Sequence, residues 1–120
     1  MTTRRHLLRL APFAAVLLLA PGLASAHART ERTVPPDGAN LEATPQTIEM
    51  HFDKEVFVTV VEMRDMLGQY HPLDWEQGRS ARKLVATPFD TLPNGGYIVH
   101  WRGLSSDGHV VTGSFEFTIG

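Results

Sequence analysis

Three runs of alternating apolar and polar residues predict half-buried β-strands. In residues 47–52, Ile48, Met50 and Phe52 alternate with polar neighbours. Residues 97–102 and 114–119 show a similar alternation. Successive side chains of a strand point to opposite faces, so a run of this kind buries one face and exposes the other.

The rest of the chain after residue 26 favours further strands and turns. Residues 56–63 are rich in β-branched side chains, and residues 84–86 form a shorter candidate strand. Turn residues occur at Pro35-Pro36-Asp37-Gly38 and Pro93-Asn94-Gly95-Gly96. No window has a convincing helical period, although residues 74–83 have room for a turn of helix. This pattern predicts one all-β domain over residues 27–120, a small Greek-key β-sandwich or barrel.

The first 26 residues have the composition of an export signal. Arg4, Arg5 and Arg9 precede an apolar stretch at residues 10–19, and Ala-Ser-Ala follows at residues 24–26. The apolar stretch is shorter than the roughly 20 residues that a membrane-spanning helix needs. We therefore predict a cleaved signal peptide at residues 1–26 and a protein that is not membrane-embedded once it is removed. The arginine pair also suits twin-arginine export, so the Sec and twin-arginine routes both stay open.

The charge balance changes once this segment is removed. The 13 acidic residues of the chain all follow residue 26, whereas only 8 of its 11 basic residues do, which gives a net charge of −5 with histidine neutral. An acidic chain argues against nucleic acid as a partner. The absence of cysteine excludes disulfides, cysteine–zinc sites and a copper–cysteine bond.

Asp107-Gly108-His109 is the strongest local candidate for metal binding. In an extended backbone, residues two apart point to the same face with Cα atoms about 6.6 Å apart, so a carboxylate and an imidazole can converge on one ion. The alternative is a plain tight turn, because Asp-Gly is a common turn dipeptide.

His27 strengthens the metal interpretation if cleavage follows Ala26. Its α-amine and ring Nδ1 would then chelate one ion in a six-membered ring. Together with His109 and Asp107 they supply a planar set of nitrogen and oxygen ligands, which suits one Cu(II) per chain. Cleavage after Ala28 also fits an A-x-A pattern and would destroy the site.

Several segments together resemble the CopC family of copper-resistance proteins. They are His27-Ala28-Arg29, Pro35-Pro36-Asp37-Gly38, Ile48-Glu49-Met50-His51-Phe52, residues 92–102, Ser105-Ser106-Asp107-Gly108-His109 and Gly113-Ser114-Phe115-Glu116-Phe117. The resemblance implies a cupredoxin-like, Ig-like β-sandwich of about seven strands in the periplasm. It also implies a copper carrier rather than an enzyme, with Cu(II) ligands at His27, Asp107 and His109.

Some members of that family also hold Cu(I) in a methionine-rich loop at the other end of the barrel. Met63, Met66 and His71 keep part of the spacing of that loop. Two thioethers and an imidazole are soft enough for Cu(I). The alternative is that Met63 and Met66 fill gaps in the core.

The expected function is therefore periplasmic copper homeostasis. The protein would hold Cu(II) and buffer it, or pass it by ligand exchange to an inner-membrane copper transporter or another copper protein. One alternative is a histidine-brace copper oxygenase, because polysaccharide monooxygenases also use an N-terminal His. Another is a metal-free Ig-like interaction module.

Overall fold

The computed structural model describes residues 28–120, and in this range the protein is built from strands alone. No helix long and apolar enough to span a membrane occurs between residues 28 and 120. The eight strands are β1 (Thr30–Val34), β2 (Ala39–Leu41), β3 (Ile48–Asp65), β4 (Tyr70–His71), β5 (Leu73–Trp75), β6 (Ser80–Pro88), β7 (Gly95–Ser105) and β8 (Val110–Ile119).

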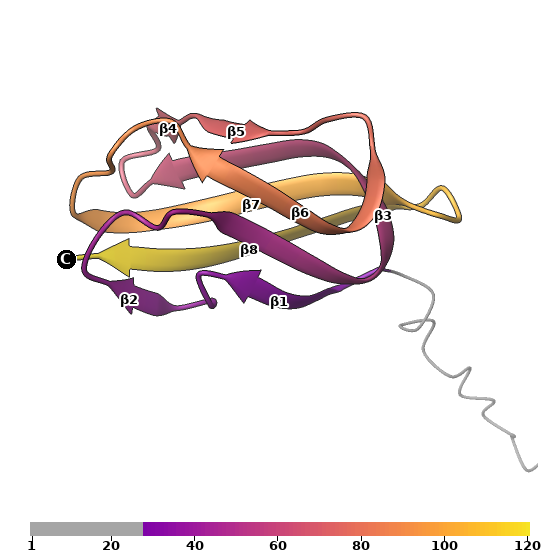
Figure 1. Ribbon diagram of the computed structural model, residues 1–120, viewed down its shortest axis with the longest axis horizontal. Helices are drawn as coiled ribbons and strands as arrows, with labels where there is room; N and C mark the ends of the chain where they lie inside the picture. The colour runs from indigo at the N-terminus through magenta and orange to yellow at the C-terminus, as the bar shows by residue number, and fades with distance from the viewer. Residues whose placement is uncertain (1–27) are drawn as a thin grey trace, which may run out of the picture.

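The strands form one curled, mixed sheet with the order β2-β8-β7-β3-β6-β5, and β1 and β4 each pair with β3. Only β2 and β8 run parallel; the other pairs are antiparallel. Strand β3 bends, and its pairing register with β6 shifts between His51 and Val56 (Figure 1). The bend lets its first part pair with β1 and its second part pair with β7. The curled, non-consecutive arrangement confirms the predicted all-β class.

The predicted alternation decides which side chains fill the core. Ile48 and Met50 are fully buried, and Phe52 is nearly so. The inward residues of β7 and β8 meet them across the curled sheet. These residues are Tyr97, Val99, Trp101, Phe115, Phe117 and Ile119. The burial of this set explains how a domain without disulfides is held together.

The structure corrects one expectation. Residues 74–83 hold no helical turn: they contain the end of β5, a loop and the start of β6. The short segments pair with neighbouring strands, and backbone pairing of this kind satisfies the same groups that a helix would satisfy. The described residues form eight strands, which agrees with the expected number of about seven.

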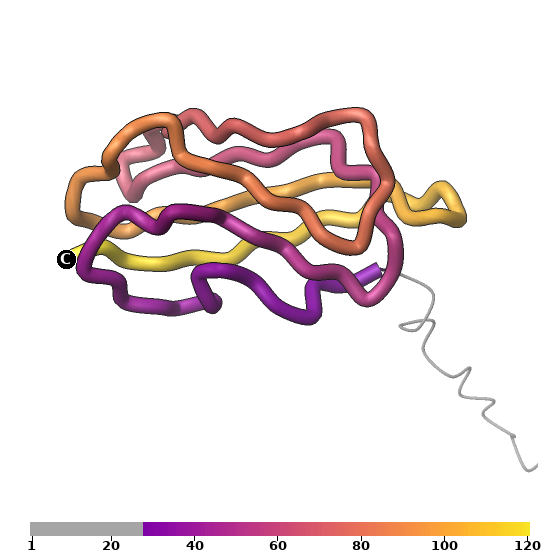
Figure 2. The backbone as a smooth tube through the Cα atoms, viewed as in Figure 1, coloured from indigo at the N-terminus to yellow at the C-terminus, as the bar shows by residue number. Residues whose placement is uncertain are grey.

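The two ends of the molecule carry different elements. The β7–β8 turn projects at one end, and the first described residues enter the fold at that same end (Figures 1 and 2). The C-terminus and the β3–β4 turn lie at the opposite end. The predicted Cu(II) ligands Asp107 and His109 in the β7–β8 turn therefore lie at the end opposite to Met66 in the β3–β4 turn.

Candidate metal site

The β7–β8 turn has a tight backbone that is closed by its own hydrogen bonds. The Gly108 N–H donates to the Ser105 carbonyl over 2.9 Å, and the Ser105 N–H donates to the His109 carbonyl over 2.9 Å. Gly108 has a φ of 84°, in the left-handed region that favours glycine. Asp-Gly therefore does form a turn, and this turn holds the flanking side chains of Asp107 and His109 close together.

Asp107 and His109 form a close side-chain pair. The Asp107 Oδ2 atom lies 2.9 Å from His109 Nδ1, with 41% of the Asp107 side chain and 64% of the His109 side chain exposed. The spacing is that of a hydrogen bond between the ring and the carboxylate. The turn thus brings both side chains to one place, and an ion bound through His109 Nδ1 would replace this hydrogen bond.

Ser105 holds the carboxylate of this pair in place. Its buried hydroxyl donates to Asp107 Oδ1 and also lies 3.2 Å from the His109 carbonyl oxygen. The His109 N–H donates to the same Asp107 oxygen over 3.2 Å. The hydrogen bond from Ser105 lowers the pKa of Asp107 most, and the contacts with His109 lower it further. The pKa of Asp107 is therefore well below its usual value. Asp107 is therefore ionised, as a metal ligand must be.

Ser105 was not predicted to have a role of its own, although it belongs to the Ser105-Ser106-Asp107-Gly108-His109 segment. Its position two residues before Asp107 was the available signal, because serine side chains often bond to groups two residues away in turns.

His27, the third predicted ligand, lies outside the described residues. Between residues 28 and 120, no three His, Asp or Glu side chains gather closely enough to hold a metal ion. Asp107 and His109 are therefore the part of the predicted Cu(II) set that the structure brings together.

The residues directly after His27 are fixed near the turn. The Arg29 N–H donates to Asp53 Oδ1 over 2.7 Å, and the Asp53 N–H donates to the Arg29 carbonyl over 3.0 Å. Ala28 is buried, with 6% of its surface exposed. Asp53 lies in the bend of β3, and Val56 just beyond it pairs with Ser105. The first described residues and the Asp107–His109 pair are thus connected to the same bend.

The candidate Cu(I) residues lie at the opposite end. Met63 is 1% exposed and pairs in register with His71, whereas Met66 is 59% exposed in the β3–β4 turn. The His71 Nε2 atom lies 2.9 Å from Asp65 Oδ2. Met63 is thus a core residue, as the alternative expected, but Met66 is too exposed to be a core filler. Cu(I) binding by these residues stays a prediction.

Comparison with solved structures shows which class of protein has this fold. The chain is similar to CopC from Methylosinus trichosporium OB3b, with a TM-score of 0.68 and 27% identity over 78% of this chain and 93% of that one. It is also similar to PcoC, a methionine-rich copper resistance protein from Escherichia coli, with a TM-score of 0.65 and 26% identity over 78% of this chain and 99% of that one. The fold is therefore that of small all-β copper resistance proteins.

The family follows from sequence comparison. The CopC domain model matches residues 30–120. Copper resistance protein C of Pseudomonas syringae pv. tomato is 34% identical over 89% of this chain and 90% of its own length. The protein of the same name from Xanthomonas campestris pv. juglandis is 31% identical over 87% of this chain and 91% of its own length. The chain belongs to the CopC family, and its membership implies a function connected with copper.

Proposed function

We propose that the protein is a periplasmic carrier that holds one Cu(II) ion between the His27 N-terminus, Asp107 and His109. The observation that supports it best is the Asp107–His109 pair, whose donor atoms are 2.9 Å apart at the end of the fold where the described chain begins. Membership of a family whose relatives are named for copper resistance supports copper as the metal.

The chemistry of the donors supports Cu(II) over other divalent ions. Nitrogen and carboxylate ligands in a plane suit Cu(II), which also binds such sites more tightly than the other common divalent ions do. A set with two His27 nitrogens, His109 and Asp107 fills four positions. The resulting site is accessible, because both described ligands are partly exposed.

Carriage by ligand exchange is the proposed activity, without catalysis. Asp107 would take an equatorial position that oxygen activation by a histidine-brace enzyme needs open. An exposed site lets an acceptor approach the ion directly. An inner-membrane copper transporter or another copper protein is the proposed acceptor, and export by the signal peptide at residues 1–26 would place the protein in the periplasm.

The test is a copper titration of protein that begins at His27. We expect one Cu(II) per chain and the electron paramagnetic resonance signal of a tetragonal site with nitrogen ligands. Zn(II) at the same concentration should not displace it. Retention of no copper on a desalting column would contradict the proposal and favour a metal-free interaction module.

A further inference from the structure

The outer edge of β8 is open over part of its length. β8 pairs with β7 along one side, and β2 covers the other side only at residues 117–119 (Figure 1). Next to that point, the Gly38 N–H donates to the Glu116 carbonyl, and the Glu116 N–H donates to Asp37 Oδ1. Within the described part of the chain, no strand pairs with this side of residues 110–114.

The open edge presents the backbone groups of every second residue. In an antiparallel ladder, successive residues direct their N–H and C=O groups to opposite sides of the strand. The outward direction that Glu116 has is therefore shared by Ser114, Thr112 and Val110. The residues between them direct these groups to β7. Three residues of β8 thus offer both a donor and an acceptor at the open edge.

Strand β1 runs nearby without closing this edge. Among the described strands, β1 pairs with β3 and not with β8. A hollow of about 470 Å³ lies between β1 and β8, and its lining includes residues 30–34 of β1 together with Ser114 and Phe115 of β8. A paired strand at about 4.8 Å from β8 would fill this space. The hollow therefore leaves room for another strand beside β8.

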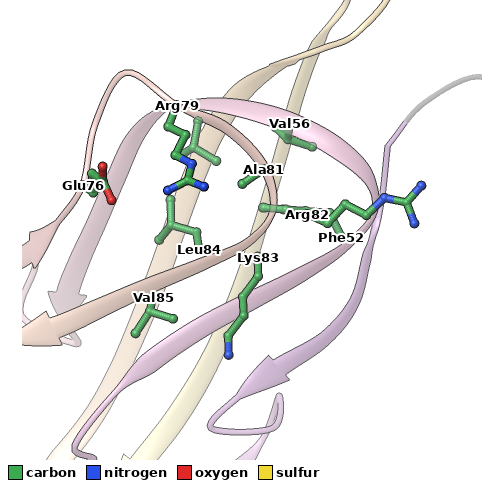
Figure 3. Close-up of a pocket in the computed structure, with 10 residues that line it drawn as sticks. Phe52, Val56, Glu76, Arg79, Ala81, Arg82, Lys83, Leu84 and Val85 are labelled. Carbon is green, nitrogen blue, oxygen red and sulfur yellow. The ribbon is translucent and has the colours of Figure 1, made fainter.

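The open edge of β8 lacks the charges that other open edges carry. β5 covers only the last part of β6, and Figure 3 shows Arg82 and Lys83 extending from the uncovered part. β1 carries Glu31 and Arg32. Charged side chains on an edge strand hinder its pairing with another chain. Residues 110–114 read Val-Val-Thr-Gly-Ser, without charge or proline, and their pairing with β7 shows no register shift.

We propose that this edge pairs with the same edge of a second copy of the chain, related by a two-fold axis at Thr112. A two-fold axis perpendicular to the sheet makes the two β8 strands antiparallel. Thr112 then lies opposite the partner's Thr112, and Val110 lies opposite the partner's Ser114. Every outward N–H and C=O group of the three residues finds a partner, because their positions are symmetric about Thr112.

The side chains suit this pairing. Thr112 is exposed, and threonine pairs on neighbouring strands are stabilising. Val110 is 52% exposed and would lose contact with water against the partner strand. On the inner face, Val111 would lie opposite the partner's Gly113, which has no side chain to clash with it. The edge is short, so its buried area is below that of a stable dimer and the association should be weak and reversible.

The experiment is sedimentation velocity of copper-free protein that begins at His27, over concentrations from about 10 µM to about 1 mM. We expect a reversible equilibrium between monomer and dimer, with the dimer populated toward the upper limit, as is usual for small interfaces. A protein that stays monomeric at about 1 mM would overturn the proposal. The open edge would then be left for an extended segment of a different protein.

Two variants of one residue locate the interface. Thr112→Lys places like charges opposite each other at the two-fold axis and should weaken the dimer at least about tenfold. Thr112→Pro removes the outward N–H but no donor of the β7–β8 ladder, and should weaken it as well. Thr118→Lys is the control, because it adds the same charge on the same face of β8 where β2 already covers the edge. Its dimer should be as strong as that of the parent.

Thermal unfolding checks that each variant folds, and if one variant of Thr112 does not fold, the other decides. A dimer that survives in a folded variant of Thr112 would contradict the assignment. Amide hydrogen exchange measured by NMR tests the register. The amides of Val110, Thr112 and Ser114 should exchange more slowly at about 1 mM than at about 50 µM, whereas those of the residues between them should not change. Slower exchange at a different strand would also contradict the proposal.

Discussion

Asp107 Oδ2 and His109 Nδ1 lie 2.9 Å apart across Gly108, so the turn brings the two side chains into contact before any ion is present. Ser105 fixes the carboxylate of this pair from the buried side. Because the two side chains already lie together, they lose little conformational freedom when their mutual contact is exchanged for bonds to one ion.

Removal of either side chain of the pair should weaken Cu(II) binding and leave the fold intact. Asp107→Ala and His109→Ala should each lower affinity by more than about 100-fold, because even a hydrogen-bond partner of a ligand contributes roughly 10–100-fold. Both side chains are partly exposed, so stability should change little. Competition against a Cu(II) chelator gives the affinities.

His100→Ala is the control for these two variants. His100 is exposed on β7 and is paired with Ser114, away from the turn. The His100→Ala variant should bind Cu(II) with the affinity of the parent protein. Parent-like affinity in both Asp107→Ala and His109→Ala would remove the turn from the metal site.

Ser105→Ala should raise the pKa of Asp107 in the copper-free protein. Hydrogen bonds to a carboxylate stabilise its charged form, and the Ser105 hydroxyl makes the largest contribution here. A lowered pKa stabilises the folded state above the pKa of the unfolded chain, and that contribution is lost as pH falls through the folded-state pKa. The variant should therefore protonate Asp107 at a higher pH than the parent.

The measurement is a carbon-detected NMR titration of the Asp107 carboxyl. The pKa should rise toward 3.8, the usual value, but stay below it because the contacts with His109 remain. The carboxyl resonance of Asp107 is the one that disappears from the spectrum of the Asp107→Asn variant. An unchanged titration in Ser105→Ala would mean that this hydroxyl does not support the carboxylate.

Gly113→Ala should destabilise the core. A Cβ at this position would lie 2.5 Å from Trp101 Nε1, so the buried indole would have to shift. Overpacking of this kind costs about 1–3 kcal/mol. Urea unfolding should show this loss together with a change in tryptophan emission. Thr112→Ala, at the exposed neighbouring position on β8, should behave as the parent does. Equal stability of the two variants would contradict the packing described here.

Cu(I) binding at Met63, Met66 and His71 should be weak or absent. Met63 is buried among core residues, and the His71 ring already contacts Asp65. A Cu(I) site here would have to release that contact and open the core around a thioether. Anaerobic competition against a Cu(I) chelator tests the prediction. A tight one-to-one complex that Met66→Leu abolishes would show that the site exists.

The strands that were predicted from sequence are those with a regular alternation. Alternating apolar and polar residues identify the buried and exposed faces of the segments 47–52, 97–102 and 114–119. The structure confirms these faces in β3, β7 and β8. Strands β1 and β2 were missed because residues such as Thr30 and Glu31 are exposed and show no alternation. Their conformation depends on pairing with β3 and β8, which local sequence does not report.

The candidate site was predictable to a different degree. Asp107 and His109 were identified by their spacing, and the turn that was considered as the alternative proved to be what joins them. The role of Ser105 depends on the geometry of the turn and therefore required the structure.

The central claim is that the free α-amine of His27 binds Cu(II) in the exported protein. Acylation turns the α-amine of His27 into an amide nitrogen without an available lone pair, which destroys the six-membered chelate. Asp107 and His109 would remain and should hold Cu(II) only loosely. The fold should tolerate a small extension, as chain termini usually do.

The most direct measurement is therefore the Cu(II) affinity of protein that begins at His27, compared with protein that carries one Gly before it. The intact mass of the exported protein establishes first that the natural chain begins at His27. We predict that the Gly extension abolishes tight Cu(II) binding while thermal unfolding of the copper-free protein stays the same. Equal Cu(II) affinity of the two proteins would contradict the account.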